Sequence, residues 1–312
     1  MEGAGARTVV FGYGELAVAS VYSLKSAGAD LVAAVIPSNR TGQDVEQFKA
    51  FAEQQQLPVL IQPPRKAVEP FVRQLRELQP DFLLVWSYPM ILPKSVIEVP
   101  KRGAFNMHGG VLPEYRGGHV MQWAIINGEK ETGMTLHYID EGIDTGPIVA
   151  ESRFSIDWHD DAAVVRDKLK SAGSALLKEW WPAVLAGRAP RRTQDESRAR
   201  YYRLRTQEDG LIQWSQSNIS IYNLVRALVS PWPGAYTFHR SCKLTIWKVE
   251  PIGESGQAFG GEVGQVVGIG SSGVIVRTGE GVLAIRSIEY EGGILNESAV
   301  SEVLTVGDLL GR

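Results

Sequence analysis

Two polar side chains, Asn106 and His108, stand one residue apart in the stretch AFNMHGGVLPEYRGG, residues 104–118. On a strand, this spacing places both side chains on the same face. An imidazole can take and return a proton near neutral pH, and an amide N–H can donate to an oxygen that gains negative charge. A Gly-Gly pair follows at once, so the face is a poor core. We interpret it as a reaction centre rather than as two polar groups that cap a loop.

Further reactive side chains lie near this stretch. LPEYRG follows it and carries Arg116, and TGMTLHYIDEGIDTGPIVAE, residues 132–151, supplies Asp144 among its acids. DFLLVWSYPMILP, residues 81–93, ends an apolar strand just upstream. Ligands of open parallel sheets bind beyond the carboxyl ends of the strands, so we expect these groups to converge there.

The elements that must position these groups alternate along the chain. Short apolar runs predict strands at residues 7–12, 30–39, 58–63 and 81–88, and the segments between them have helical periodicity. This alternation predicts an α/β domain with a Rossmann-like, mostly parallel sheet covered by helices on both faces. A long amphipathic helix is predicted over residues 160–187.

The character of the sequence changes after this helix. Residues 189–205 are polar, basic and weakly periodic, which is typical of a linker. A helix at 215–230 and several short β-rich runs with glycine turns follow. We therefore predict a catalytic domain at 1–188, a linker at 189–205, and a smaller β-rich, OB-like domain at 206–312.

The composition is that of an ordinary globular protein. The 312 residues include 32 Lys and Arg against 35 Asp and Glu, a net charge of −3, so no basic surface indicates a nucleic-acid partner. Cys242 is the only cysteine, which excludes an internal disulfide and fits a reducing compartment. Without a basic, apolar leader or a long apolar run, we expect a soluble, cytoplasmic protein with no membrane segment. The histidines lack zinc-ligand spacing, so we expect no metal.

A glycine-rich turn suggests a different activity. FGYGELA places Gly12, Gly14 and Ala17 in the G-x-G-x-x-G/A spacing of a dinucleotide site, between a predicted strand and a predicted helix. Asp30 follows 18 residues after Gly12, but it precedes the second strand instead of ending it, where a ribose-binding acid is expected. A nicotinamide-dependent dehydrogenase therefore stays as an alternative supported by one weak motif.

Three motifs occur together between NMHGGVLPEYRGG and GIDTGPIVA: N-x-H, L-P-x-Y-R-G and D-x-G. Together they resemble the signature of the methionyl-tRNA formyltransferase family, enzymes that use N10-formyltetrahydrofolate. EDGLIQW, IYNLVRAL and PWPGAYT, beyond residue 206, are similar to the carboxyl domain of the tRNA and aminoarabinose formyltransferases. The resemblance implies an N-formyltransferase that moves a formyl group from N10-formyltetrahydrofolate to a primary amine.

The resemblance maps the catalytic Asn, His and Asp of the family onto Asn106, His108 and Asp144. Asn106 would donate to the formyl oxygen and His108 would carry a proton, while Asp144 would orient the imidazole or order a water that relays the proton. The family places the pterin of the folate against the backbone of WSYPMIL and YIDEGID. We carry over five folate-binding positions on that basis, of which the two aromatic residues could equally be core: Trp86, Tyr88, Ile91, Ile139 and Asp140.

The acceptor is predicted from weaker signals. The glycines of GGVLPEYRGG resemble the amino-sugar branch of the family, which implies a nucleotide-linked 4-amino sugar as the acceptor. Arg116 and His119 would border its pocket, and Arg203 and Arg205 would grip a diphosphate, which guanidinium groups bind bidentately. A tRNA acceptor, which calls for a basic surface, and another small amine remain as alternatives. We expect His137 and His159 to be structural.

Overall fold

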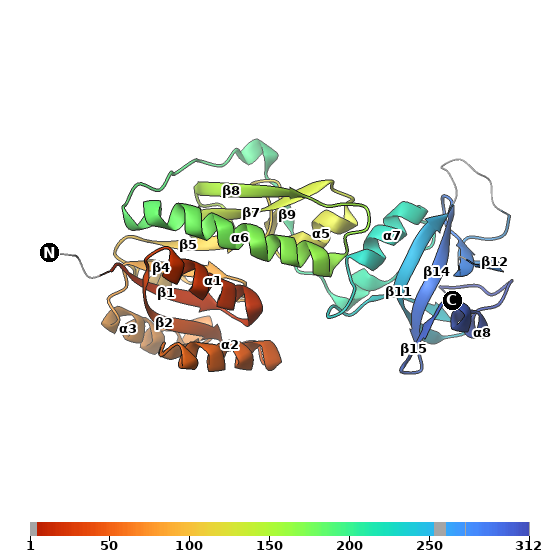
Figure 1. Cartoon of the computed structure of the whole chain (residues 1–312), viewed down its shortest axis with the longest axis horizontal. Helices are drawn as coiled ribbons and strands as arrows, with labels where there is room; N and C mark the ends of the chain where they lie inside the picture. The colour runs from red at the N-terminus through yellow and green to blue at the C-terminus, as the bar shows by residue number, and fades with distance from the viewer. Residues whose placement is uncertain (1–4, 253–259, 272, 312) are drawn as a thin grey trace. The chain divides into compact units, whose positions relative to one another are not determined.

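The computed structural model describes residues 5–252, 260–271 and 273–311, and the chain forms two compact units (Figure 1). The first unit takes in the chain up to Val120 together with Glu131–Phe154 and Asp167–Tyr202. The second takes in Met121–Lys130, Ser155–Arg166 and the chain from Arg203 onward. Most of the segment expected to be a linker therefore packs on the first unit, as far as Tyr202.

The first unit is built on a seven-stranded sheet in the order β3-β2-β1-β4-β5-β7-β8. The pairs among the first five strands of this order are parallel, whereas β5 and β7 are antiparallel. This confirms the prediction of a mostly parallel, Rossmann-like sheet. The strands are β1 (Arg7–Gly12), β2 (Asp30–Pro37), β3 (Val59–Gln62), β4 (Phe82–Trp86), β5 (Gly103–His108), β7 (Glu131–Tyr138) and β8 (Ile148–Ser155).

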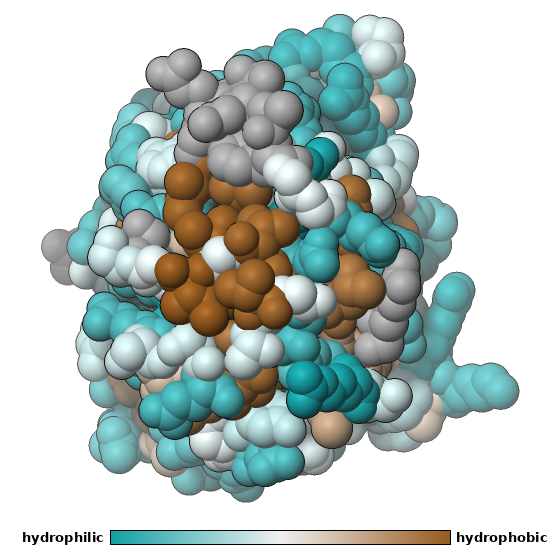
Figure 2. All heavy atoms as spheres, turned by 90° about the vertical axis from the view of Figure 1, so that its right-hand side faces the viewer, coloured by the Kyte–Doolittle hydropathy of each residue, from teal (hydrophilic) through white to brown (hydrophobic). Residues whose placement is uncertain are grey.

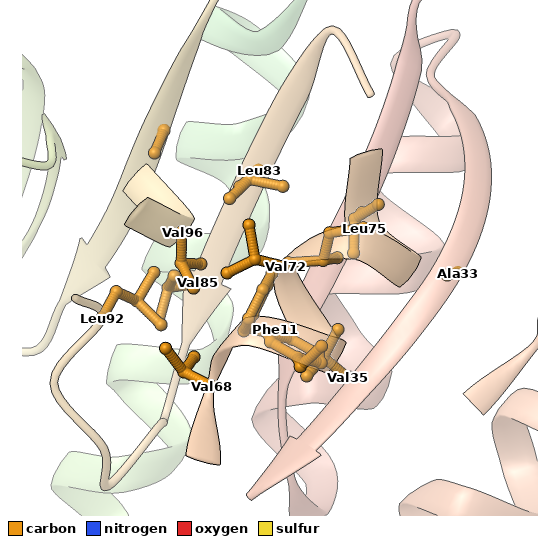
Figure 3. Close-up of a cluster of buried hydrophobic side chains, with 13 residues drawn as sticks. Phe11, Ala33, Val35, Val68, Val72, Leu75, Leu83, Val85, Leu92 and Val96 are labelled. Atoms are coloured by element: carbon orange, nitrogen blue, oxygen red, sulfur yellow. The ribbon is translucent and has the colours of Figure 1, made fainter. Parts of the chain in front are cut away.

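Helices between the strands cover the sheet. They are α1 (Gly14–Ser26), α2 (Gln43–Gln54), α3 (Glu69–Glu77), the short α4 (Lys94–Ile97) and the long α6 (Ala162–Leu185), whereas α5 (Val120–Ile126) belongs almost wholly to the second unit. Alternate residues of a strand face opposite sides of the sheet. Phe11 of β1 therefore packs together with Val72 and Leu75 of α3, as Figure 3 shows, and Val9 belongs to the same buried cluster. Burying each such side chain contributes roughly 1.5–3 kcal/mol.

The opposite face of the sheet packs against α1 and α6. The ring of Trp181 in α6 lies edge-on to Phe82 and Phe105, with ring centroids 5.8 and 5.6 Å away. Gly173 of the same helix lies so close to the Trp86 indole that a Cβ would overlap the ring. Helices on both faces leave the carboxyl ends of the strands as the accessible edge.

The second unit contains a six-stranded antiparallel sheet, which confirms the predicted β-rich carboxyl domain. Its path runs β10-β11-β14-β13-β12, with β15 paired to β14. Isolated bridges from His239 to Leu310 and from Gln265 to Leu309 connect both end strands to the last stretch of the chain. The strands are β10 (Ala235–His239), β11 (Cys242–Ile252), β12 (Val266–Gly270), β13 (Gly273–Arg277), β14 (Val282–Tyr290) and β15 (Gly293–Asn296).

Helix α7 (Asn218–Arg226) begins where Ser217 accepts a hydrogen bond from the Ser220 amide at 3.1 Å. A second short helix of this unit is α8 (Val300–Val303). On the face shown in Figure 2, apolar side chains form a patch over the second unit. The exposed apolar residues of this unit include Val263, Ile269 and Val306. Within the described part of the chain, no helix is long and apolar enough to cross a membrane.

Candidate active site

The antiparallel pair of β5 and β7 assembles the centre of the site. Asn106 and His108 extend from one face of β5, and the strand register sets His137 of β7 directly opposite Asn106. Asp144 comes from the loop between β7 and β8, and its carboxylate lies within 3.5 Å of all three side chains. The structure therefore brings together Asn106, His108 and Asp144, as the sequence predicts, and adds His137.

The imidazole of His108 is buried and its tautomer follows from its partners. Its Nε2 lies 2.5 Å from the carbonyl oxygen of Tyr115, which can only accept, so Nε2 carries the hydrogen. Its Nδ1 lies 3.4 Å from Oδ2 of Asp144. Burial lowers the pKa of His108, while the Asp144 charge opposes that effect. Neutral His108 thus presents the Nδ1 lone pair as its proton-accepting atom.

A second buried imidazole orients the amide of Asn106. Nδ1 of His137 lies 2.8 Å from the carbonyl oxygen of Tyr138 and must donate to it. The other nitrogen, Nε2, then accepts from Nδ2 of Asn106 at 3.1 Å. The second N–H of this amide makes only a long contact with Asp144, at 3.4 Å. That N–H is the one that can turn to a substrate oxygen.

The carboxylate of Asp144 is mostly buried, and its hydrogen bonds come from groups of the protein. Oδ2 accepts the Gly117 amide at 2.9 Å. Burial by itself would raise the pKa of Asp144, but its attraction to the His108 imidazole when that ring is protonated and the hydrogen bond from the Gly117 amide hold it well below its usual range. Asp144 is therefore ionised near neutral pH. Its backbone has φ of +54°, an unusual conformation for a residue other than glycine.

The side chain of Arg116 is buried and fully engaged within the first unit. Nε and Nη2 donate to Oε1 of Gln194, at 3.1 and 2.8 Å. Nη2 and Nη1 donate to the two carboxylate oxygens of Glu196, at 2.7 and 2.9 Å, and Nη1 also donates to the Tyr201 hydroxyl at 2.7 Å. These bonds use all five N–H groups of a guanidinium. The arrangement argues against the expected substrate-binding role of Arg116, because no donor is left over.

The positions expected to bind folate differ in exposure. The Trp86 ring lies in the core, so its expected contact could come only from its backbone. Tyr88 packs edge-on to Phe11, and its buried hydroxyl has no hydrogen-bond partner among the described residues. Burial raises the pKa of that hydroxyl well above its ordinary value. Ile91 is 76% exposed.

Ile139 and Asp140 open the loop that carries Asp144. Ile139 is half-buried against the cluster of Figure 3. Asp140 is exposed and accepts from the Thr145 hydroxyl at 2.5 Å. An ion pair of 2.6 Å between Lys94 and Glu141 connects this loop to the first residue of α4.

The remaining acceptor positions lie in two places. His119 is exposed in the first unit, with φ of +54°. Arg203 and Arg205 belong to the second unit, where Arg203 donates to Asp209 at 2.7 Å and Arg205 is half-buried beside the Trp123 ring. Their contact with an acceptor stays a prediction. Within the described residues, no cluster of His, Cys, Asp and Glu is placed to hold a metal ion.

The glycine-rich turn has a packing explanation. A Cβ on Gly12 would lie 2.6 Å from the Cβ of Ala17 and 2.7 Å from the Trp86 carbonyl oxygen, so α1 can approach the sheet only where glycine stands. In the parallel pairing of β1 and β2, Asp30 stands beside Arg7 at the start of both strands, which is the amino edge of the sheet. A dinucleotide would bind at the opposite edge, so Asp30 cannot hold its ribose.

Two residues of the site escaped the sequence analysis. His137 lies in a strand pattern and looks structural until the register of β5 and β7 is known. Gln194 lies in the segment expected to be a linker, yet its amide donates to the carbonyl oxygens of Asp144 and Gly146, at 2.8 and 2.7 Å. The sequence offered one signal for His137. It lies two residues after Thr135, so both side chains lie on the same face of a strand.

Comparison with known proteins gives consistent matches along most of the chain. Residues 6–180 match the formyl transferase family model, and residues 205–298 match the model of the formyl transferase C-terminal domain. Methionyl-tRNA formyltransferase of Geobacter sulfurreducens is 34% identical over 294 residues, which is 93% of this chain and 90% of that protein. Its counterpart in Caldanaerobacter subterraneus is 36% identical over 291 residues, 92% of this chain and 93% of that protein.

Solved structures match the fold at lower identity. An N-formyltransferase from Helicobacter canadensis, in complex with folinic acid and dTDP-3-aminofucose, has a TM-score of 0.69 at 20% identity and covers 90% of this chain and 99% of that one. WlaRD, a sugar 3N-formyl transferase solved with dTDP and 5-N-formyl-THF, has a TM-score of 0.67 at 22% identity, with 91% and 98% covered. At these identities the likeness concerns the fold.

Proposed function

Because the chain belongs to the formyl transferase family, we propose that it transfers a formyl group from N10-formyltetrahydrofolate to the primary amine of a nucleotide-linked amino sugar. The observation that carries the transfer is the meeting of an amide donor, a neutral imidazole and an ionised carboxylate at the carboxyl end of β5. Asp144 lies 38 residues after Asn106, and its carboxylate contacts the side chains of both Asn106 and His108.

These groups suit amine attack on a formamide-like carbon. A new C–N bond forms to the acceptor amine, the bond between the formyl carbon and N10 breaks, and one proton passes from the amine to N10. His108 Nδ1 accepts the amine proton, and Asp144 at 3.4 Å stabilises the imidazolium that results. The redirected N–H of Asn106 donates to the formyl oxygen as negative charge develops there. His108 then returns the proton, and no covalent bond to the protein is needed.

The folate supplies the formyl group on N10. The residues present fit such a ligand, because a flat ring with polar edges needs apolar cover and hydrogen-bond partners. Ile91 offers exposed apolar surface, and the Tyr88 hydroxyl is buried without a partner among the described residues. Ile139 and the backbone around Asp140 complete the proposed set, together with the backbone of the β4 end.

The proposed acceptor is a small molecule rather than a nucleic acid, because the chain carries no net positive charge. With 32 basic and 35 acidic residues, the protein lacks the excess of cations that phosphate-rich RNA requires. The relatives solved with dTDP or dTDP-3-aminofucose support a nucleotide-linked sugar.

A second candidate acceptor is the methionyl group of charged tRNA. Relatives more than 30% identical over most of the chain are methionyl-tRNA formyltransferases, and both domains match. This candidate predicts binding that weakens steeply as salt rises.

One experiment distinguishes the two acceptors. The protein is incubated with N10-formyltetrahydrofolate and, separately, a panel of nucleotide-linked amino sugars and methionyl-tRNA. Mass spectrometry should find an amino sugar heavier by about 28 mass units, the difference between CHO and H. His108→Gln should abolish this product, whereas the matched variant of an exposed histidine, His159→Gln, should form it normally. Formylation of the tRNA alone would contradict the amino-sugar proposal, and product from neither acceptor would contradict both.

A further inference from the structure

A glutamine far along the chain holds the backbone of the catalytic aspartate. Gln194 is 6% exposed and lies 50 residues after Asp144. Its amide nitrogen donates to the carbonyl oxygens of Asp144 and Gly146, at 2.8 and 2.7 Å. These two bonds fix the peptide groups that follow Asp144 and Gly146.

The orientation of that amide is set by Arg116. Oε1 of Gln194 accepts from Nε and Nη2 of Arg116. Because a guanidinium only donates, the oxygen must face it and the NH₂ group must face Asp144. A flipped amide would set donors against donors and oxygen against two carbonyl oxygens. In the observed orientation, both N–H groups of the Gln194 amide donate and both lone pairs of its oxygen accept a hydrogen bond.

Arg116 is itself held in place by two further residues. Glu196 and Tyr201 take its remaining donors. The short strand β6 (Arg116–Gly117) pairs in parallel with β9 (Tyr201–Tyr202). A Cβ on Gly117 would overlap the Tyr202 carbonyl oxygen, so the pairing needs glycine there. The Gly117 amide is the group that donates to the Asp144 carboxylate.

The conformation of Asp144 requires such support. A φ of +54° lies in the left-handed region that residues other than glycine adopt uncommonly, and conformations of this kind persist where the surroundings over-determine them. Gly142 and Gly146 on either side give the loop freedom to relax. Without the Gln194 bonds, the loop can turn the carboxylate away from His108.

We propose that Gln194, oriented by Arg116, is a positioning residue that keeps the carboxylate of Asp144 facing His108. The inference rests on the proposed function only for the reaction that this pair serves, since the contact between the carboxylate and the imidazole is itself measurable.

The test uses Gln194→Glu in the full chain. A glutamate keeps the length of the side chain and its acceptors for Arg116, but it sets an oxygen against the two carbonyl oxygens of the Asp144 loop. We expect kcat to fall at least about tenfold, with KM for the folate changed less than about threefold. Gln194→Met, which removes the donors without adding charge, replaces this variant if the glutamate form does not fold.

Asp195→Asn is the matched control. It changes an exposed carboxylate next to Gln194 that accepts from the amide and hydroxyl of Ser197, and it leaves the bonds among Arg116, Gln194 and Asp144 in place. We expect kcat within about twofold of the unmodified protein. Equal losses in the Gln194 and Asp195 variants would overturn the proposal, because the effect would then reflect the general stability of the segment.

The titration of His108 gives a readout that needs no substrate. The groups facing its ring are Asp144, His137 and the Tyr115 carbonyl. NMR of the labelled histidines should show a lower pKa of His108 in Gln194→Met, since Asp144 raises that pKa in the native arrangement. Methionine adds no charge of its own, so the change reports the displacement of Asp144. An unchanged or raised pKa would overturn the proposal, whereas a lowered pKa in a protein that formylates no amine would count against the proposed function alone.

Discussion

Replacing Asp144 with asparagine removes the charge beside His108 with little change in shape. The asparagine oxygen can still accept the Gly117 amide, which donates to Asp144 at 2.9 Å. What is lost, in the proposed mechanism, is the attraction between the carboxylate and the imidazolium that forms when His108 takes the amine proton. The variant therefore isolates one electrostatic contribution to the transfer.

The size of that contribution follows from the geometry. Two unit charges at the 3.4 Å between Nδ1 and Oδ2 attract by about 5 kcal/mol at an effective dielectric of about 20, and by about 1 kcal/mol in bulk water. The Asp144 side chain is 13% exposed, so we take about 3 kcal/mol, between the two limits. At about 1.4 kcal/mol for each factor of ten, Asp144→Asn should lower kcat by about 10²-fold.

The pH profile gives the sign of the effect. His108 must be neutral to act as a base, so kcat/KM rises with pH as it loses its proton. Asp144 raises the pKa of His108, and its replacement should move this acid limb to lower pH. The assay is single-turnover formyl transfer over a range of pH, with Asp30→Asn at the far edge of the sheet as the control. A variant within about threefold of the unmodified rate, with an unmoved acid limb, would refute the assigned role of Asp144.

Two further predictions concern the support of the site. His137→Leu removes the acceptor that orients the Asn106 amide, so kcat should fall about tenfold while KM for the folate stays within about twofold; single-turnover kinetics test this, and an unchanged kcat would contradict the orienting role. Gly12→Ala would place a Cβ 2.6 Å from Ala17 and should destabilise the fold by about 1–3 kcal/mol. Urea unfolding measures that loss, and equal midpoints for the two proteins would show that α1 has more room than the structure gives it.

The core of the first unit was predictable because its strands are short apolar runs. β1 coincides with the predicted range, and β4 lies within its own, since parallel strands buried on both faces carry continuous apolar residues. The antiparallel direction of β7 was not predicted, because direction depends on how the chain returns to the sheet. That direction determines the pairing of Asn106 with His137.

The candidate site was predictable where reactive residue types cluster in the sequence. Asn106, His108 and Asp144 stand in short, motif-bearing stretches, so their types and spacing indicate chemistry. Arg116 looked like a substrate ligand for the same reason, although a buried guanidinium can equally be saturated by partners from a distant segment. Gln194 carries no charge and lies in a polar run, so only its contacts reveal what it does.

The position of Gln194 in the chain bears on when the enzyme can become active during synthesis. A ribosome releases Asn106, His108 and Asp144 well before it adds Gln194, 50 residues beyond the aspartate. Until that later segment folds back and pairs β9 with β6, a nascent chain holds the reactive groups but lacks the bonds to the aspartate backbone. A fragment cut at residue 188, where the sequence suggests the catalytic domain ends, would stay in that unfinished state and should be nearly inactive.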